Sequence, residues 1–305
     1  MIQVLGHKSP DTDSTGSPII WAWYLNDVRK QPAKAVLQGQ PNTEAVWMLE
    51  HWNVQMPEII TDVAAGEQLV IVDTNNAVEL PASLAEAEVI EIIDHHLLAG
   101  NITTRLPINM TLRPLACTAT IMFDLIGDDL DRAPRAIKGL MLTCILSDTL
   151  EFRSPTTTPH DRWVAEKLAR DLDLSIPAYA TEMFRAKSNV SAFADEALLR
   201  IDSKEYDLGD KRLRVSVLET TAPEVLLARK DALMAAMPGV AAEDGADEVL
   251  LFVVDILREE ATLLVPNPWV AGVATRSFGV PVTGDTVLLP GVVSRKKQII
   301  PVLKV

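Results

Sequence analysis

Four short clusters in the first half of the chain carry side chains of the types that bind metal ions. They read GHKSPDTDS, VDTNN, DHH and SDT, and their candidate residues are His7, Asp11, Asp13, Asp73, Asp94, His95, His96 and Asp148. A single aspartate after a strand usually forms a turn or caps a helix, and a single histidine usually has a structural role, which we assign to His51 and His160. The set is more informative, because three of the five histidines fall in two of these clusters.

Carboxylates together with imidazoles favour Mn²⁺, Co²⁺ or Fe²⁺, and Mg²⁺ or Zn²⁺ also accept them, whereas metals that prefer thiolates do not. Asp11 and Asp13 are two residues apart. In an extended loop their side chains point to opposite sides, so they would serve two ions, with a carboxylate from another strand end bridging the pair. Two divalent ions about 3.5–4 Å apart acidify a bridging water and neutralise an anionic substrate. The clusters therefore predict hydrolysis of a phosphate compound.

The elements before the clusters must position these side chains. The runs Gln68 to Thr74 and Glu88 to His96 are typical of strands that end in acidic or imidazole side chains. Helical patterns cover PNTEAVWMLEHW and TPHDRWVAEKLARDL, the second with Thr158 as its N-cap and Pro159 at its first position. Strands that alternate with helices predict a parallel sheet, whose ligands bind beyond the carboxyl ends of the strands.

Asp148 follows the apolar run LMLTCILS, which only Thr143 and Ser147 interrupt. Residues 139–147 are long for a buried strand, so we expect a core helix that ends at the site. Such a helix would hold the Asp148 carboxylate rigidly.

The second half of the chain has a different texture. We expect a first domain over residues 1–187, a flexible linker of small and polar residues over 188–195, and a smaller α/β domain over 196–305. In the second domain RLRVSVLET, EVLLFVVDI and ATLLVP predict strands, and APEVLLARKDALMAAM predicts one helix between the first two.

A basic segment, SRKKQIIP, stands near the end of this acidic chain. A consecutive run of Arg295, Lys296 and Lys297 is either a solvated surface charge run or a clamp for phosphate groups. If the segment is a strand, Arg295 and Lys297 share one face and Lys296 lies on the other.

Composition excludes several classes of protein. The formal net charge of -14, from 42 acids and 28 bases, opposes non-specific binding to nucleic acid. Long apolar stretches and a secretory signal pattern are both missing from the sequence, so we expect no membrane span and a cytoplasmic location. Cys117 and Cys144 form no CxxC pair, and we expect both to be ordinary buried side chains.

In their order and separations, GHKSPDTDS, VDTNN, DHH, SDT and VSRKKQIIP resemble the manganese-dependent family II inorganic pyrophosphatases of the DHH phosphoesterase superfamily. The four acidic clusters indicate the superfamily, and SRKKQ indicates the pyrophosphatase branch. The resemblance covers essentially the whole chain. It implies two α/β domains, a DHH domain with a parallel sheet and a smaller DHHA2-type phosphate-binding domain, with the active site between them, and a homodimer. The implied reaction is hydrolysis of pyrophosphate to two phosphates by a water or hydroxide that bridges two divalent ions.

The resemblance also implies roles for single residues. One ion would be held by His7, Asp11 and Asp73, and the other by Asp13, Asp73, His95 and Asp148. The substrate would be bound by His96, Lys204, Arg295 and Lys296, and protons handled by Asp94 and His96. Two Mn²⁺ per subunit are expected, with Co²⁺ or Mg²⁺ as substitutes and additional Mg²⁺ accompanying the substrate. One departure from the family is Ser9, where members often have asparagine.

Two alternatives remain open at the level of sequence. Another DHH phosphoesterase would act on short oligonucleotides, cyclic dinucleotides or polyphosphate, but nucleotide-specific members generally carry a glycine-rich motif and this chain has no Gly-Gly pair. A non-catalytic module that binds metal or anions would keep the ligands for structure or sensing. The presence of every ligand position disfavours it.

Overall fold

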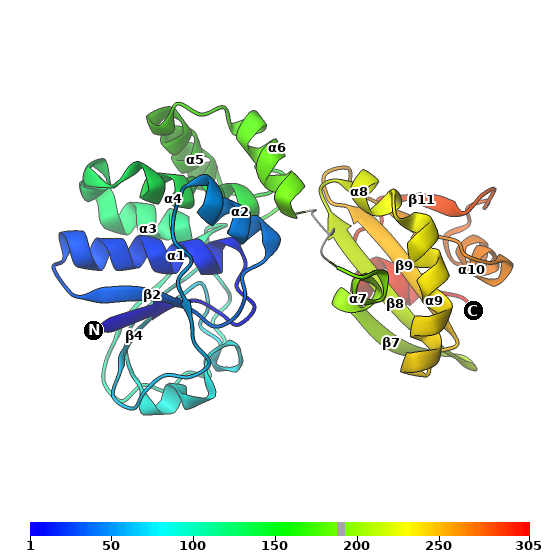
Figure 1. Ribbon diagram of the computed structural model, residues 1–305, viewed down its shortest axis with the longest axis horizontal. Helices are drawn as coiled ribbons and strands as arrows, with labels where there is room; N and C mark the ends of the chain where they lie inside the picture. Colours follow the sequence, from blue (N-terminus) through cyan, green and yellow to red (C-terminus); the bar gives the residue numbers. More distant parts are fainter. Residues whose placement is uncertain (188–192) are drawn as a thin grey trace. The chain divides into compact units, whose positions relative to one another are not determined.

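In a computed structural model the chain forms two compact units, Met1–Ala186 and Lys187–Val305 (Figure 1). The structure describes residues 1–187 and 193–305, so residues 188–192 of the expected linker lie outside the described part.

A six-stranded, wholly parallel sheet forms the centre of the first unit, in the order β3-β2-β1-β4-β5-β6. Its strands are β1 (Ile2–Leu5), β2 (Ala33–Leu37), β3 (Glu58–Ile59), β4 (Gln68–Val72), β5 (Glu88–Asp94) and β6 (Asn109–Leu112). The strand order reverses direction between β1 and β4. In sheets of this kind a ligand binds beyond the carboxyl ends of the strands at such a reversal.

The helices of the first unit are α1 (Thr12–Trp23), α2 (Thr43–His51), α3 (Thr118–Ile126), α4 (Arg135–Asp148), α5 (Pro159–Leu172) and α6 (Ile176–Lys187). Short helical turns are η1 (Tyr24–Val28), η2 (Ala77–Glu79), η3 (Ala82–Glu86) and η4 (Gly127–Arg132). Figure 1 shows α1 next to the sheet, with α3, α4 and α5 stacked beyond it. Residues 139–147 of α4 are all buried, which confirms the prediction of a core helix that ends at Asp148.

The predicted start of α5 is also confirmed. Thr158 accepts a hydrogen bond from the Asp161 N–H, and the Asp161 side chain accepts one in return from the Thr158 N–H at 2.9 Å. This capping box satisfies two backbone donors that the helix itself leaves unpaired. Pro159 occupies the first turn, where its missing N–H costs nothing.

A five-stranded sheet in the order β11-β10-β9-β8-β7 forms the second unit, and β8 and β9 are its parallel pair. Its strands are β7 (Ser203–Leu208), β8 (Lys211–Thr220), β9 (Glu248–Asp255), β10 (Glu260–Leu264) and β11 (Thr286–Pro290). Its helices and turns are α7 (Asp195–Ile201), α8 (Pro223–Leu227), α9 (Lys230–Asp244), α10 (Pro268–Phe278), η5 (Arg295–Ile299) and η6 (Ile300–Val302). The predicted second α/β domain is therefore present, and its three predicted strands are β8, β9 and β10.

The prediction of one helix between β8 and β9 was wrong. The chain leaves helical geometry at Arg229, with φ -99° and ψ 7°, so α8 and α9 are separate. The Arg229 side chain binds the start of α7, through the Phe193 carbonyl at 2.9 Å and Asp195 at 2.7 Å. In addition α9 continues through Pro238 to Asp244 and ends at Gly245, which has a φ of +65°.

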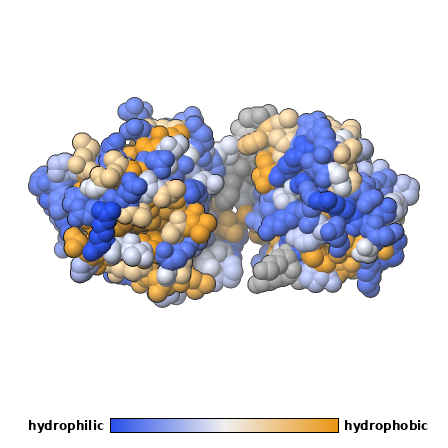
Figure 2. Space-filling view, turned by 90° about the horizontal axis from the view of Figure 1, so that it is seen from below, coloured by the Kyte–Doolittle hydropathy of each residue, from blue (hydrophilic) through white to orange (hydrophobic). Residues whose placement is uncertain are grey.

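On the surface, apolar and hydrophilic residues are mixed over the face of each unit that Figure 2 shows. Large apolar side chains exposed in the first unit include Val78, Leu97, Leu98, Leu106 and Met110. Within residues 1–187 and 193–305, every helix is too short or too polar to cross a lipid bilayer.

Replacing Gly139 with alanine should lower the free energy of unfolding by about 1–3 kcal/mol. A Cβ at this position of α4 would lie 2.2 Å from ring atoms of Trp52, and this clash outweighs the gain of about 1 kcal/mol that alanine brings to a helix. Urea denaturation measures the change. Gly239→Ala in α9 is the matched control, because no described atom lies within 4 Å of its added Cβ. It should be stabilising, and equal effects of both variants would contradict close packing at Gly139.

Candidate metal centre

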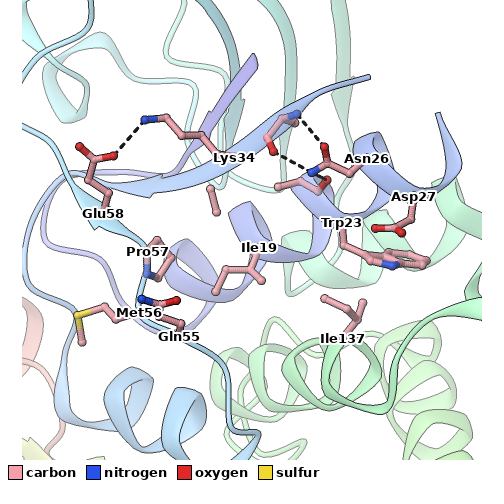
Figure 3. Close-up of a pocket in the computed structure, with 13 residues that line it drawn as sticks. Ile19, Trp23, Asn26, Asp27, Lys34, Gln55, Met56, Pro57, Glu58 and Ile137 are labelled. Atoms are coloured by element: carbon pink, nitrogen blue, oxygen red, sulfur yellow. Dashed lines mark hydrogen bonds and ion pairs between the residues drawn. The ribbon is translucent and has the colours of Figure 1, made fainter. Parts of the chain in front are cut away.

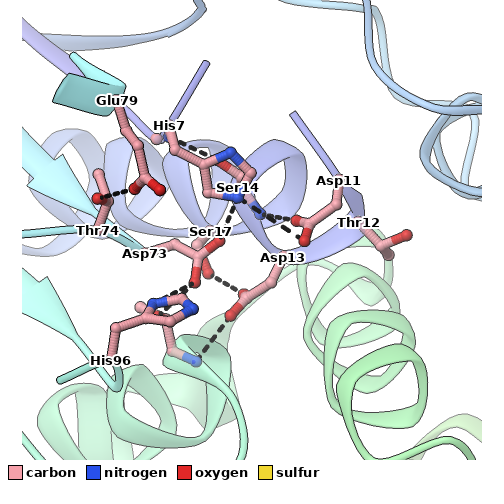
Figure 4. Close-up of polar contacts among 12 residues, drawn as sticks. His7, Asp11, Thr12, Asp13, Ser14, Ser17, Asp73, Thr74, Glu79 and His96 are labelled. Carbon is pink, nitrogen blue, oxygen red and sulfur yellow. Dashed lines mark hydrogen bonds and ion pairs between the residues drawn. The ribbon is translucent and has the colours of Figure 1, made fainter. Parts of the chain in front are cut away.

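Three neighbouring strands deliver the candidate ligands to one edge of the first sheet. His7 follows β1 by two residues, Asp73 follows β4 directly, and β5 ends in Asp94 with His95 and His96 next to it. Because β1, β4 and β5 are adjacent in the sheet, their carboxyl ends bring these side chains together. Figure 4 shows His7, Asp73 and His96 of this cluster, together with Asp11 and Asp13 from the start of α1.

His7, Asp11 and Asp73 form the first group of possible ligands, whose ligand atoms lie within 4.8 Å of one another. The His7 Nε2 atom is 3.5 Å from Asp73 Oδ2 and 3.7 Å from Asp11 Oδ2. Its other ring nitrogen, Nδ1, lies 2.7 Å from the Lys8 carbonyl, so Nδ1 carries the hydrogen and Nε2 offers a lone pair to an ion.

A second group consists of Asp13, Cys117 and Asp148. Asp13 lies in the first turn of α1, and its carboxylate accepts hydrogen bonds from Ser17 Oγ at 2.5 Å and from the Thr118 N–H at 2.7 Å. Asp148 is the last residue of α4, and among the described residues its buried Oδ2 atom has no hydrogen-bond partner.

Asp11 and Asp13 therefore fall in different groups, but the expected extended loop was wrong. Asp11 is the N-cap of α1 and accepts a hydrogen bond from the Ser14 N–H at 2.9 Å. Asp13 is already helical, so the turn from cap to helix separates the two carboxylates. Ser9, the departure from the family pattern, has a φ of +58°, a conformation that asparagine tolerates better than serine.

Asp73 also belongs to a third group, with His95 and His96. Its Oδ1 atom is 3.3 Å from His95 Nε2, and its backbone has a positive φ of 60°. The Nδ1 atom of His95 donates to the Leu115 carbonyl at 3.2 Å, which again leaves Nε2 as the ligand atom. His96 is more exposed, and its Nδ1 lies 2.9 Å from the buried Asp94 Oδ1.

Burial and mutual repulsion dominate the electrostatics of the cluster. Burial, together with the charges of Asp13 and Asp11, raises the pKa of both Asp73 and Asp148 well above the ordinary value. For His7, burial acts against the charged form, but the hydrogen bond with Asp11 and the charge of Asp73 outweigh it and raise the pKa to about 9. All three shifts favour the protonated forms, as expected where buried carboxylates outnumber positive charges.

These residues fit divalent cations. The buried Oδ2 atoms of Asp73 and Asp148 accept no hydrogen bond from any described residue. Buried carboxylate oxygens normally have a hydrogen bond or a cation. Oxygen and imidazole donors of this kind suit Mn²⁺ and similar ions.

Sequence reasoning missed Thr118 and gave Cys117 no role at the site. Thr118 begins α3, its N–H donates to Asp13, and its hydroxyl donates to Asp73 at 3.2 Å. Cys117 is buried as expected, but beside Asp13 and Asp148. The only available signal was the threonine at the start of the apolar helix TATIMFDLI. That pattern does not indicate that Thr118 contacts Asp13 and Asp73, which lie far away in sequence.

In the second unit the expected phosphate-binding residues lie on β7 and η5. Lys204 is an exposed residue of β7. Arg295 contacts Asp202, with Nη2 at 2.7 Å from its carboxylate and Nη1 donating to its carbonyl at 2.8 Å. Lys296 is the second residue of η5.

The expectation that residues 295–297 alternate as in a strand was wrong, because Arg295–Ile299 is a π-helical turn. The Gln298 side chain closes this turn. Its Oε1 accepts from the N–H groups of Val293 and Ser294, and its Nε2 donates to the Gly291 carbonyl. In a helical turn, successive side chains do not alternate between two faces as they do along a strand.

The remaining two histidines have aromatic neighbours. His51 packs against Trp47, Trp52 and Tyr179. His160 stacks on Trp163 and lies 2.8 Å from Asp124. Both contacts agree with the structural role assigned from the sequence.

Two of the grooves on the first unit can be compared with the position of the candidate ligands. One groove has a volume of about 510 Å³ and is lined by residues of α1 and β2, the segment around Pro57, and Ile137 (Figure 3). Lys34 and Glu58, which also line it, form an ion pair with a distance of 3.0 Å between Nζ and Oε2. None of the candidate ligands is among the described residues that line it. The other, of about 580 Å³, is lined by His95, His96 and Arg113 among others, and therefore adjoins the metal centre.

A parallel sheet with aspartates and histidines beyond its central strands is the arrangement expected for the DHH phosphoesterases. Family models agree: the DHH family N-terminal domain matches residues 1–147, and the DHHA2 domain matches residues 181–305. The chain belongs to the family II, manganese-dependent inorganic pyrophosphatases, as its relatives show.

Two curated relatives carry the description "Probable manganese-dependent inorganic pyrophosphatase". The protein of Deinococcus radiodurans is 38% identical over 310 residues, covering 100% of this chain and 98% of its own. The protein of Enterococcus faecalis is 33% identical and covers 99% of this chain and 97% of its own. These matches confirm the family expected from the motifs.

Solved structures lead to the same family. A crystal structure from Methanococcus jannaschii, assigned in its title to the family II inorganic pyrophosphatases, has a TM-score of 0.66 and 32% identity, covering 99% of this chain and 97% of that one. An exopolyphosphatase-related protein from Bacteroides fragilis, with a TM-score of 0.51 and 12% identity, shares the fold alone.

Removing divalent metal with EDTA should lower the melting temperature at neutral pH, because the buried carboxylates then repel one another. The expected loss is roughly 5–10 °C against protein with Mn²⁺ about 100-fold above its dissociation constant. In the folded, metal-free protein the pKa of Asp73 and Asp148 is raised, so these groups bind protons at a higher pH than they do in the unfolded chain. The free energy of unfolding of the metal-free protein therefore rises as the pH falls. The EDTA effect should therefore shrink on acidification towards about pH 5.5.

Thermal scans with EDTA or Mn²⁺ at both pH values measure this difference. An EDTA effect that grows on acidification would contradict repulsion among unneutralised carboxylates.

Proposed function

We propose that the chain hydrolyses inorganic pyrophosphate to two phosphates with two Mn²⁺ ions per subunit. One observation carries the proposal: Asp73 belongs to two groups of possible ligands, and it lies where the strand order reverses. A carboxylate shared in this way supports two adjacent ions. Names of the relatives support manganese and pyrophosphate.

His7, Asp11 and Asp73 would hold one ion, and the other would be held by Asp13, Asp73, His95 and Asp148. Two divalent ions, when bound, supply a water of lowered pKa and offset the charge of the phosphate groups. Co²⁺ or Mg²⁺ would substitute, and additional Mg²⁺ would accompany the substrate.

Asp94 and His96 would handle the proton of the leaving phosphate. Burial acts to raise the pKa of Asp94, but hydrogen bonds from His96 and Asn75 outweigh it and keep that pKa below the ordinary value. The Asp94 carboxylate lies 2.9 Å from His96 Nδ1 and orients the imidazole ring, which lines the adjoining groove. The ring would exchange a proton with a phosphate oxygen there.

Lys204, Arg295 and Lys296 would bind the phosphate groups. Arg295 is already oriented by Asp202, so less rotamer freedom is lost when it binds an anion. A guanidinium offers two parallel donors to a phosphate, and lysines add point charges. These cations would offset the charge that develops on the leaving phosphate.

We also propose a homodimer in the cytoplasm. Met110 is exposed in the edge strand β6, and the exposed Leu97 and Leu98 line a groove together with Leu112 of that strand. These are apolar side chains that a second copy could cover. Light scattering during gel filtration tests the dimer, and cell fractionation tests the location.

Asp148→Ala should bind one Mn²⁺ per subunit instead of two, since Asp148 serves a single ion. Asp73→Asn should weaken both sites, because its carboxylate is shared. Metal analysis after dialysis, together with Mn²⁺ titration, measures the stoichiometry. Retention of two tightly bound ions in Asp73→Asn would contradict the bridging role.

Purified protein with Mn²⁺ should release phosphate from pyrophosphate and leave a dinucleotide intact, which separates this function from that of nucleotide-specific DHH enzymes. Lys296→Ala should lower kcat/KM by about 10²–10³-fold, the usual cost of removing one group that stabilises charge in the transition state, while metal content stays the same.

Lys297→Ala is the matched control, because it removes a neighbouring charge that the family pattern does not use. Cleavage of the dinucleotide alone would refute the proposed substrate. Equal kcat/KM in both lysine variants would refute the role of Lys296.

A further inference from the structure

Glu44 is a fully buried acidic residue that has no part in the function proposed above. It is the second residue of α2, in a sequence, PNTEAVWML, whose pattern predicts only an amphipathic helix. Burying a carboxyl group costs free energy unless it is well hydrogen-bonded, and an apolar residue would pack the same helix without that cost. Its contacts therefore require an explanation.

A single oxygen of Glu44 links two ligand-bearing segments. Thr12 Oγ1 donates to Oε1 at 2.5 Å, and Ser147 Oγ donates to the same atom. Thr12 stands between the ligands Asp11 and Asp13, and Ser147 directly precedes Asp148. Thr12, Glu44 and Ser147 are all buried, so water does not compete for these two hydrogen bonds.

The start of α2 is attached to the same loop, which fixes Glu44 in place. The Asn42 N–H donates to the Pro10 carbonyl at 3.1 Å, and the Asn42 side chain caps the helix by accepting from the Ala45 N–H at 2.8 Å. Glu44 therefore approaches Thr12 from a fixed backbone.

Thr12 is also held through its carbonyl, to which Cys144 Sγ donates at 3.3 Å from α4. In Figure 4 its side chain points away from the cluster of His7, Asp13 and Asp73. The hydroxyl thus faces the support behind the ligands, and the carboxylates of its two neighbours face the metal centre.

From these contacts we propose that Glu44 is a positioning residue of the metal centre. Through Thr12 and Ser147 it sets the distance between the start of α1, which carries Asp11 and Asp13, and the end of α4, which carries Asp148. Glu44 touches neither substrate nor ion. The inference rests on the proposed function, because it assumes two ions whose separation must be kept.

Glu44→Ala in the full chain should bind Mn²⁺ about 10- to 100-fold more weakly, the usual effect of removing a group that orients metal ligands. Calorimetric titration of the metal-free protein measures it. The EPR spectrum of the manganese-loaded protein should also change, because magnetic coupling depends on the separation of the ions. At saturating Mn²⁺, kcat should fall and KM for pyrophosphate should stay within a factor of about 3. Glu44→Gln, which keeps an acceptor oxygen, should recover most of the affinity.

Glu91→Ala is the matched control. Glu91 is a half-buried carboxylate of β5 that accepts from Trp21 Nε1 at 2.9 Å, near the end of α1 opposite Asp11 and Asp13. Its loss removes a partly buried hydrogen bond from the same unit and leaves the contacts of Thr12 and Ser147 in place. This control should bind Mn²⁺ normally and keep the EPR spectrum of the unmodified protein. Normal Mn²⁺ affinity in Glu44→Ala, or an equal loss in Glu91→Ala, would overturn the inference.

If Glu44→Ala does not fold, the double variant Thr12→Val, Ser147→Ala replaces it, since this pair removes both donors and keeps Glu44. Normal Mn²⁺ affinity in the double variant would likewise overturn the inference. The titration needs no substrate, so the two ideas fail separately. If Mn²⁺ affinity depends on Glu44 but the protein does not hydrolyse pyrophosphate, the proposed function is refuted and the positioning role of Glu44 stands.

Discussion

Repulsion among buried carboxylates is the constraint on which the first unit depends. The charge of Asp13 lies close enough to raise the pKa of Asp73 and Asp148, and burial removes the water that would screen these carboxylates. Cations or protons relieve this repulsion, so metal binding and folding stability are coupled. The surrounding structure keeps the carboxylates from moving apart when no ion is bound.

Rigid elements supply that restraint from several directions. The adjacent strands β1, β4 and β5 fix three of the ligand segments by backbone hydrogen bonds. The start of α3 donates to Asp13 and Asp73 through Thr118, and the buried helix α4 ends in Asp148. Each ligand is thereby placed by regular structure, which positions side chains more accurately than loops do.

Much of this centre could be predicted from sequence, because strand ends and helix patterns are local signals. The run before Asp148 was too long for a strand and became a core helix, and Thr158 capped α5 as expected. The wrong predictions also have causes that can be named. Asp11 looked like a loop residue because an N-cap and a turn share the same composition, and SRKKQ looked extended because the closing role of Gln298 depends on hydrogen bonds to residues before it. Thr118 and Glu44 could not be found at all, since their partners lie far away in sequence.

The positive φ of Asp73 limits how this centre can evolve. Glycine, asparagine, aspartate and histidine are the residues that adopt such a backbone readily, and of these only aspartate brings two oxygens and a negative charge. Glutamate, the obvious substitute elsewhere, has the wrong backbone preference and a longer reach. Descendants of this chain can therefore change their metal preference by exchanging other ligands, while the shared aspartate stays fixed by the shape of the main chain.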